Sequence, residues 1–586
     1  METAGMVGEA VGRERFKADA LVIMNTLMQK SGQSSTAVDQ FVLEHVAGAC
    51  GAMCRALGED FGMFLPIVLP PLIKALGAET GFNIEEADDD EETQETTMDE
   101  DTGNVTSVLH IRGLGPRKVT LNTFAVESKQ QTAARLIFEY ADALGKAFLP
   151  HTPTAAAALL PAITFKFSEE VRSAAALALG KVFCATMEAQ VAGLGEGGPT
   201  TLATDLLGPC VTALLNGLKG EAHGDARSCM SSALRDILRA CLESGGTEQS
   251  TGQQRPAKLQ PPLDAAIAMS RELVDRARES IARRKEKEAE FAGEEWDEED
   301  QDVLAEELET EEELMEHLVD SLGYLLKGHG KDYLPVFEEV SAPLFGPLLG
   351  STSPSALRWN AVCMFDDVVE HCGQGAQRHL PLCFPAFVAG MTEESNPMLQ
   401  MAAVYGVQQV AKHAPDYFRS HVQQASSFVL PMLVSLVTRP NAREEENVFV
   451  TENAVSTLGV LCTLPALEAF VDRAQLLPLW LSNLPLKEDE VEARACHRQL
   501  CSLVEQGDTA VLGADMGQVP VVVRVMADVL ETMVNNKEAA IADQATTHRI
   551  GQVLRGMQTS VAQDVMQAAW QGLSPGQRTA VQQATA

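Results

Sequence analysis

Residues 168–183 read Ser-Glu-Glu-Val-Arg-Ser-Ala-Ala-Ala-Leu-Ala-Leu-Gly-Lys-Val-Phe, and this stretch decides the fold class. Its apolar residues return every three to four positions, which is the spacing of one face of an α-helix. Ser168 suits an N-cap, and the two glutamates after it favour the positive end of a helix dipole. We therefore predict an amphipathic helix here, with Gly180 inside it.

A Leu-Pro pair recurs before similar helical stretches on both sides of this segment. A proline is tolerated in the first turn of a helix, because its missing N–H would have no partner there. The last four of these prolines are 46, 50 and 47 residues apart, which is close to the period of two-helix HEAT repeats. The prolines are Pro66, Pro150, Pro335, Pro381, Pro431 and Pro478.

Glycines occur at one register of the second helix that follows such a proline. Gly180, Gly406 and Gly459 lie 30, 25 and 28 residues after their own Leu-Pro proline. A glycine inside a helix costs about 1 kcal/mol relative to alanine, so its recurrence needs a packing reason. We expect close stacking of neighbouring repeats at these positions.

Together these patterns predict an all-α, right-handed α-solenoid of about ten HEAT-like units. We assign residues 1–518 to the array and 519–586 to C-terminal helical repeats or a cap. Two acidic loop insertions are expected, at about 82–122 and 285–302, and residues 105–120 within the first read as a loop or short strand. The array opens on half a repeat, which suggests a part of a longer protein.

The 586 residues carry 45 Lys and Arg against 82 Asp and Glu, a formal net charge of −37. Residues 85–101 hold 11 acids and residues 294–313 hold 13, and neither run contains Lys or Arg. Such a chain is not expected to bind nucleic acid directly or to dock on an anionic membrane, but it can attract basic proteins. The acidic runs are also read as solvated loops that serve solubility.

Other function classes find little support in the sequence. The twelve cysteines lie mostly in apolar segments with helical spacing, and they form no disulfide or zinc-ligand pattern. No nucleophile elbow, metalloprotease, P-loop or kinase signature is present. We therefore expect no enzymatic activity, no cofactor and no metal.

Residues 358–372, Arg-Trp-Asn-Ala-Val-Cys-Met-Phe-Asp-Asp-Val-Val-Glu-His-Cys, resemble a segment of the importin-β family, of the importin five (karyopherin beta-three) type. Further segments resemble the same family and follow in the order found there: Ala402–Gly406, Thr451–Ala454, Leu477–Asp489 and Leu573–Gln577. The resemblance covers nearly the whole chain but only the C-terminal half of such importins, which are α-solenoids of about twice this length.

The resemblance implies a nuclear transport receptor that shuttles between the cytoplasm and the nucleus through the nuclear pore. Members of the family bind protein cargo on the inner solenoid surface and Phe-Gly nucleoporins in grooves between outer helices. They release cargo when Ran-GTP, the loaded Ran GTPase, binds, mainly through N-terminal and central repeats.

An acidic concave surface on the second helices could pair with Lys and Arg of a basic import cargo. The candidate cargo-binding residues are Asp366, Asp367 and Glu370 on one helix and Glu452 and Asn453 on another, with Trp480 as a stacking surface. For each of them a structural role, as a cap, an inter-repeat pair or a core residue, remains open. The alternative function is a HEAT-repeat scaffold, or an acidic chaperone for basic proteins such as histones or ribosomal proteins.

Overall fold

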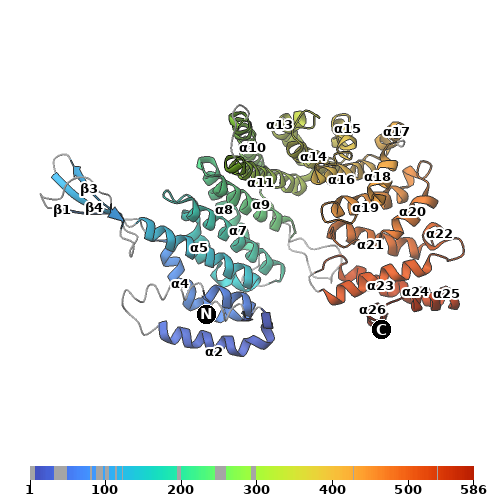
Figure 1. Ribbon diagram of the computed structural model, residues 1–586, viewed down its shortest axis with the longest axis horizontal. Helices are drawn as coiled ribbons and strands as arrows, with labels where there is room; N and C mark the ends of the chain where they lie inside the picture. The colour runs from blue at the N-terminus through green and yellow to red at the C-terminus, as the bar shows by residue number, and fades with distance from the viewer. Residues whose placement is uncertain are drawn as a thin grey trace. The chain divides into compact units, whose positions relative to one another are not determined.

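The computed structural model describes residues 7–8, 10–31, 49–78, 82–86, 97–98, 105–111, 115–121, 123–193, 200–243, 259–291, 298–425, 428–536 and 539–585. The chain forms two compact units, Met1–Gly328 and His329–Ala586. Both are built from antiparallel helix pairs that stack in sequence order (Figure 1). The predicted all-α solenoid architecture is confirmed.

The first unit stacks its helix pairs in two rows, and the second helix of each pair packs on the second helix of the next. The helices α5, α7 and α9 form the closest such stack, with α4, α6 and α8 as their partners in the other row. The helices are α2 (Arg13–Ser31), α4 (Leu65–Leu76), α5 (Thr123–Leu144), α6 (Thr152–Ala162), α7 (Glu169–Val191), α8 (Thr200–Gly220), α9 (Gly224–Glu243), α10 (Leu263–Phe291) and α11 (Glu298–His329), with 3₁₀ turns η1 (Gly58–Phe64) and η2 (Gly145–His151).

Helix α7 confirms the local prediction. Ser168 adopts extended backbone angles, and its hydroxyl accepts a hydrogen bond from the backbone N–H of Val171 at 3.2 Å. The helix runs on to Val191, and its predicted apolar face is buried between α5 and α9. By length and composition, α7 and residues 49–76 could each cross a membrane, but 67% of the most apolar part of α7 is buried inside the protein.

The first acidic insertion contains a small antiparallel sheet. Its strands are β1 (Phe82–Glu86), β2 (Thr97–Met98), β3 (Val105–Ile111) and β4 (Gly115–Leu121), in the order β1-β4-β3-β2. Ile84 pairs with Val119, and Thr106 pairs with Thr120. The segment 105–120, expected as a loop or short strand, is therefore the β3–β4 hairpin, whereas most of the acidic run between β1 and β3 lies outside the described residues.

The second acidic insertion is not a loop in the part that the structure describes. Residues 298–313 belong to α11, and residues 285–291 complete α10, so only 292–297 lie outside the description. The expectation of a loop over 285–302 was wrong because glutamate is a good helix former. Leu304 and Leu308 lie four residues apart within the charged run, which is a helical apolar spacing.

The second unit continues the same two-row pattern. Helices α14, α16, α19, α21 and α24 stack on one another as a second-helix row, and α15 and α18 are the first helices of their pairs. The α-helices are α12 (Leu334–Val336), α13 (Ala342–Leu348), α14 (Ser355–His371), α15 (Leu380–Gly390), α16 (Pro397–His413), α17 (Pro415–Ala425), α18 (Val429–Thr438), α19 (Val448–Thr463), α20 (Arg473–Ser482), α21 (Glu490–Glu505), α22 (Thr509–Leu512), α23 (Val519–Asn535), α24 (Gln544–Ser560), α25 (Gln563–Gln571) and α26 (Pro575–Thr585). Short turns of other helix types are η3 (Gly330–Tyr333), η4 (Phe337–Ser341), η5 (Gly373–His379) and η6 (Pro465–Leu467).

Most of the recurring prolines and glycines have the expected kinds of role. Pro150 is an exception, because it lies inside η2 and not in the first turn of α6. Pro66 and Pro381 lie in first turns, but Pro478 lies inside α20, because the carboxylate of Asp472 caps that helix earlier, at Ala474. A Cβ on Gly180 would lie 3.1 Å from the Cα of Ala233 in the next second helix. A Cβ on Gly406 would instead meet Phe387 of its own pair.

Candidate functional site

The residue at the fourth position of several second helices ties that helix to the next repeat. Arg172 of α7 donates two hydrogen bonds to the carboxylate of Glu221, at 2.5 and 2.9 Å, in the loop before α9. Arg358 of α14 donates to Glu393, in the loop before α16, at 2.6 Å. Such charge-assisted contacts fix the spacing and register of successive pairs. The loops between paired helices are thus held firmly in place.

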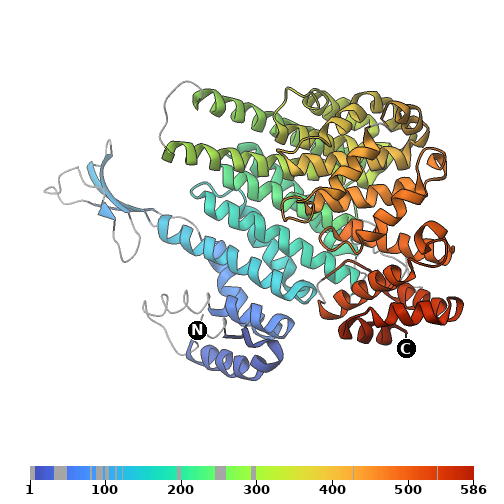
Figure 2. The same ribbon diagram turned by 45° about the vertical axis from the view of Figure 1, so that its right-hand side comes forward.

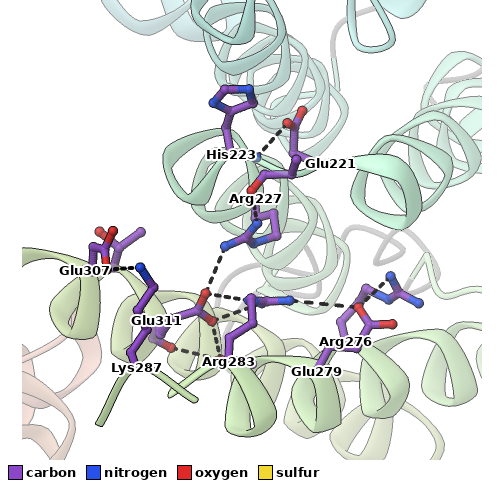
Figure 3. Close-up of polar contacts among 12 residues, drawn as sticks. Glu221, His223, Arg227, Arg276, Glu279, Arg283, Lys287, Glu307 and Glu311 are labelled. Carbon is purple, nitrogen blue, oxygen red and sulfur yellow. Dashed lines mark hydrogen bonds and ion pairs between the residues drawn. The ribbon is translucent and has the colours of Figure 1, made fainter. Parts of the chain in front are cut away.

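Arg227, at the fourth position of α9, makes the corresponding contact to α11. Its Nη2 donates to the carboxylate of Glu311 at 2.8 Å. The same carboxylate accepts hydrogen bonds from Nε and Nη2 of Arg283 at 2.7 and 3.0 Å, and from the hydroxyl of Ser280 at 2.6 Å. Figure 3 shows these side chains converging from α9, α10 and α11.

The Glu311 contacts are largely shielded from water. The side chains of Arg227 and Glu311 are only 10% and 11% exposed. Burial alone would raise the pKa of Glu311, but the hydrogen bonds from Arg283 and Ser280 hold this pKa below its ordinary value. The carboxylate is therefore ionised at neutral pH and compensates two guanidinium groups, which fastens the α10–α11 hairpin to α9.

A cleft of about 640 Å³ lies beside this cluster. Four cationic side chains line it, and seven carboxylates do so as well, which leaves an excess of three negative charges. Lys287 pairs with Glu307 across α10 and α11 at 2.8 Å, as Figure 3 shows. The carboxylates are Glu169, Asp225, Glu286, Glu290, Glu306, Glu307 and Glu311, and the cations are Arg227, Arg283, Arg284 and Lys287. Its charge suits a cationic segment better than an anionic one.

In the second unit, two of the predicted cargo residues remain partly exposed. Asp367 and Glu370 lie on α14, with side chains 30% and 28% exposed. The hydroxyl of Tyr405 on α16 donates to Glu370 at 2.6 Å. The Nε2 atom of His371 lies 3.8 Å from Asp367 and 3.7 Å from Glu370. These groups form a small acidic patch where α14 meets α16.

By distance alone, this patch could hold a divalent ion. One ligand atom each from Asp367, Glu370 and His371 lies within 4.8 Å of the others. Carboxylate oxygens and imidazole nitrogens are common metal ligands. However, Glu370 is already engaged by Tyr405, and both carboxylates lie near the imidazole, so the arrangement is explained by contacts within the protein.

The other four predicted residues lie inside the protein, and their assignment to a cargo surface needs correction. Trp480 is fully buried and Glu452 is 1% exposed. Asp366 and Asn453 are 5% and 3% exposed. Side chains without accessible surface cannot stack on or pair with a cargo residue in this conformation. Burial first, and then the charges of Asp367 and Glu370, raise the pKa of Asp366 well above its ordinary value.

Glu452 and Asn453 have a structural role instead. The Glu452 carboxylate accepts hydrogen bonds from the backbone N–H groups of Lys487, Glu488 and Asp489, at 2.9, 3.1 and 2.7 Å. The side-chain amide of Asn453 donates to the carboxylate of Asp489 at 2.8 Å. These two residues therefore tie α19 to the acidic loop before α21. In the same way, Arg358 ties α14 to the loop before α16.

Comparison with known proteins finds similarity to importins. The family model described as Importin repeat 6 matches residues 266–350. A probable importin-5 homolog of Dictyostelium discoideum is 24% identical over 579 residues, which cover 97% of this chain and 48% of that protein. Importin subunit beta-3 of Saccharomyces cerevisiae is 21% identical over 520 residues, which cover 87% of this chain and 43% of that protein. The chain is thus similar to importins over most of its length.

Solved structures agree on the fold of this chain. A mutant of Kap121p superposes with a TM-score of 0.69 at 19% identity, covering 100% of this chain and 48% of that one. Kap121p bound to RanGTP superposes with a TM-score of 0.65 at 17% identity, covering 99% and 48%. The chain thus spans about half the length of the relatives that it matches, as the resemblance to a C-terminal half predicted.

The repeat matched by the family model includes part of the Glu311 cluster, which was not among the predicted site residues. Residues 266–350 span α10 and α11, which contain Arg283 and Glu311. A signal was present, since Arg172, Arg227 and Arg358 each occupy the fourth position of a second helix. Their partners lie 49, 84 and 35 residues further on, so no fixed spacing reveals them.

Proposed function

We propose that this chain is the C-terminal part of a nuclear transport receptor that carries protein cargo into the nucleus. The observation that carries this proposal is the match to importins along 97% of the chain, together with the two-row helical stack. Its relatives by name are importins rather than enzymes, which supports a non-enzymatic role. A receptor of this kind shuttles between the cytoplasm and the nucleus.

The proposed cargo is basic and binds to acidic surfaces of the second-helix row. The partly exposed carboxylates Asp367 and Glu370 are the best placed of the predicted residues. Each desolvated hydrogen-bonded pair with a Lys or Arg of cargo contributes about 1.5–3 kcal/mol, so several pairs are needed for useful affinity. The charged cleft beside Glu311 is a second acidic surface of the same character.

Phe-Gly nucleoporins are the second proposed class of partner, and they would bind on first helices. Large apolar side chains are exposed there: Ile67 on α4 is 54% exposed and Leu382 on α15 is 50% exposed. Shallow apolar surfaces beside them can accept a phenylalanine ring. Kap121p has been solved bound to the nucleoporin Nup53p and to RanGTP, which supports nucleoporin and Ran binding for the whole receptor.

The first experiment is a pull-down of this chain on immobilised Phe-Gly repeats and, in parallel, on Ran-GTP and on a basic import segment. We expect capture by Phe-Gly repeats and the basic segment, and weaker capture by Ran-GTP, whose main contacts are expected in repeats outside this chain. Binding of the basic segment without any Phe-Gly binding would overturn the receptor proposal and favour a scaffold or an acidic chaperone.

The cargo surface is tested with a double variant, Asp367→Asn with Glu370→Gln. Its matched control is Asp416→Asn with Asp564→Asn, which removes the same charge from exposed positions of α17 and α25. We expect the first variant alone to weaken binding of the basic segment at least about fivefold, which corresponds to about 1 kcal/mol. Equal effects of the two variants would show that only net charge matters.

A further inference from the structure

Three consecutive second helices of the second unit present an exposed apolar side chain at the same place. Met398, Phe449 and Val491 are each the second residue of their helix, in α16, α19 and α21. Their side chains are 43%, 45% and 63% exposed, whereas every other large apolar side chain of these helices is buried or half-buried. The three helices follow one another in the stack (Figure 2). The result is an apolar row across the N-terminal ends of the three helices.

The loops that lead into these helices adjoin one another along the same edge. Arg439, in the loop before α19, donates to Gln400 at the start of α16 at 3.3 Å. Arg443, in the same loop, donates to the carbonyl and side chain of Asn483, which follows α20, at 3.0 and 3.1 Å. Glu452 then fixes the loop before α21. We call residues 391–398, 439–449 and 483–491 together the loop edge.

The loop edge is strongly acidic around its apolar row. Six exposed acids belong to it, and each loop contributes at least one. Only two exposed cations occur among its residues, Arg443 and Lys487, and Arg443 is engaged with Asn483. The acids are Glu394, Glu444, Glu445, Glu446, Glu488 and Glu490. An apolar row between carboxylates favours a partner that offers apolar and cationic groups together.

We propose that the loop edge binds an extended, basic segment of a partner protein that carries an apolar side chain at every third residue. Packed helices lie about 8–10 Å apart, so neighbouring apolar positions are separated by a similar distance. A polyproline-type chain advances about 3.1 Å per residue, so three residues span about 9 Å. The two residues between apolar contacts can then carry Lys or Arg toward the flanking glutamates.

The chemistry of the edge argues against other occupants. A nucleic acid or an anionic membrane surface would be repelled by the six glutamates. A purely basic segment would leave Met398, Phe449 and Val491 in water and gain nothing from them. Because hydrogen bonds to Glu452, Asn453 and Gln400 hold the loops in place, binding would order few additional residues of the receptor.

The test measures fluorescence anisotropy of a labelled peptide of about 12 residues that repeats Leu-Lys-Lys, titrated with the full chain. The control peptide has the same composition, but all its leucines lie at one end. One triple variant, Met398→Ser, Phe449→Ser and Val491→Ser, removes the apolar row. A second, Glu394→Lys, Glu445→Lys and Glu488→Lys, reverses three charges of the edge. Its control, Glu468→Lys, Asp515→Lys and Asp564→Lys, makes the same charge change at exposed positions elsewhere in the unit.

We expect the repeating peptide to bind at least about tenfold more tightly than the control peptide, and each edge variant to lose that advantage. The control variant is expected to retain it, and all variants should show the circular dichroism and melting temperature of the parent chain, because every substituted residue is exposed. Equal affinity for the two peptides, or no loss in the serine variant, would overturn the proposal by showing attraction through charge alone. These outcomes are independent of Phe-Gly and Ran-GTP binding, so the proposed transport function is tested separately.

Discussion

The substitution Gly459→Ala tests whether the glycines inside second helices exist for close packing. A Cβ at this position of α19 would lie 2.5 Å from Nε1 of Trp480 and 2.8 Å from Oε1 of Gln499. Trp480 is fully buried and cannot swing into solvent. The side-chain amide of Gln499 donates to the carbonyl of Gly459 at 2.7 Å, so displacing Gln499 also breaks a hydrogen bond.

The expected cost follows from three opposing contributions. Overpacking a filled site costs about 1–3 kcal/mol. Loss of the hydrogen bond from Gln499 costs about 1 kcal/mol, whereas alanine gains about 1 kcal/mol over glycine in helix propensity. The net destabilisation is therefore about 1–3 kcal/mol, which should appear as faster amide hydrogen exchange in α19, α20 and α21, measured by mass spectrometry.

The matched control is Gly556→Ala in α24. This glycine is exposed, and a Cβ there would meet no heavy atom within 4 Å apart from its chain neighbours and the nearby backbone of its own helix. Only the propensity gain of up to about 1 kcal/mol therefore remains. The two substitutions should thus change local stability in opposite directions. If Gly459→Ala left exchange unchanged or slowed it, close packing would not be the reason for a glycine at this position.

Three further predictions concern buried charges. Glu311→Ala should destabilise the attachment of α10 and α11 by about 3–5 kcal/mol, because it leaves the buried guanidinium of Arg227 uncompensated. The measurement is amide hydrogen exchange along both helices. The control is Glu309→Ala, at an exposed position of the same helix, which should change exchange little. Asp320 has its pKa raised by burial to about 6 from 3.8, so the folded state binds this proton more tightly and stability is lost as pH rises through the window from about 4 to 6. Asp320→Asn should therefore raise the free energy of unfolding at pH 7 by up to about 3 kcal/mol, seen as a higher melting temperature, and should have little effect near pH 4. An equal effect at both pH values would contradict this. Glu452→Gln should weaken the hold on residues 487–489 by about 1–3 kcal/mol, seen as faster exchange of those amides, and an unchanged rate would mean that the loop is fixed by other contacts.

Much of the fold could be predicted because its signals are local. The N-cap at Ser168, the helical apolar spacing after it and the recurring Leu-Pro pairs depend on residues close together in the chain. The acidic run at 294–313 was wrongly predicted as a loop because its net charge was taken as a sign of a loop. Glutamate is a good helix former, and the leucines of the run are four residues apart, as on one face of a helix. The strand β1 was missed since its pairing with β4 joins residues more than 30 positions apart.

The candidate site was harder to predict than the fold. Asp366, Glu452 and Asn453 are polar residues whose helical positions allow either an exposed or a buried face, and a single sequence does not reveal which neighbours cover them. The structure shows that Glu452 satisfies three backbone N–H groups of the following repeat. A buried carboxylate of this kind stabilises the fold because an unsatisfied buried N–H group is costly, and its partners cannot be read from spacing.

The contact of Gly180 with Ala233 has a geometric consequence for everything that follows it in the first unit. The absence of one methyl group lets the backbones of α7 and α9 approach until a Cβ would lie 3.1 Å from the Cα of Ala233. In a stack where each helix pair rests on the one before, a small tilt at this interface is inherited by every later pair, and the displacement grows with distance along the stack. The short distance between α7 and α9 at Gly180 therefore helps to set the direction in which the α10–α11 hairpin projects.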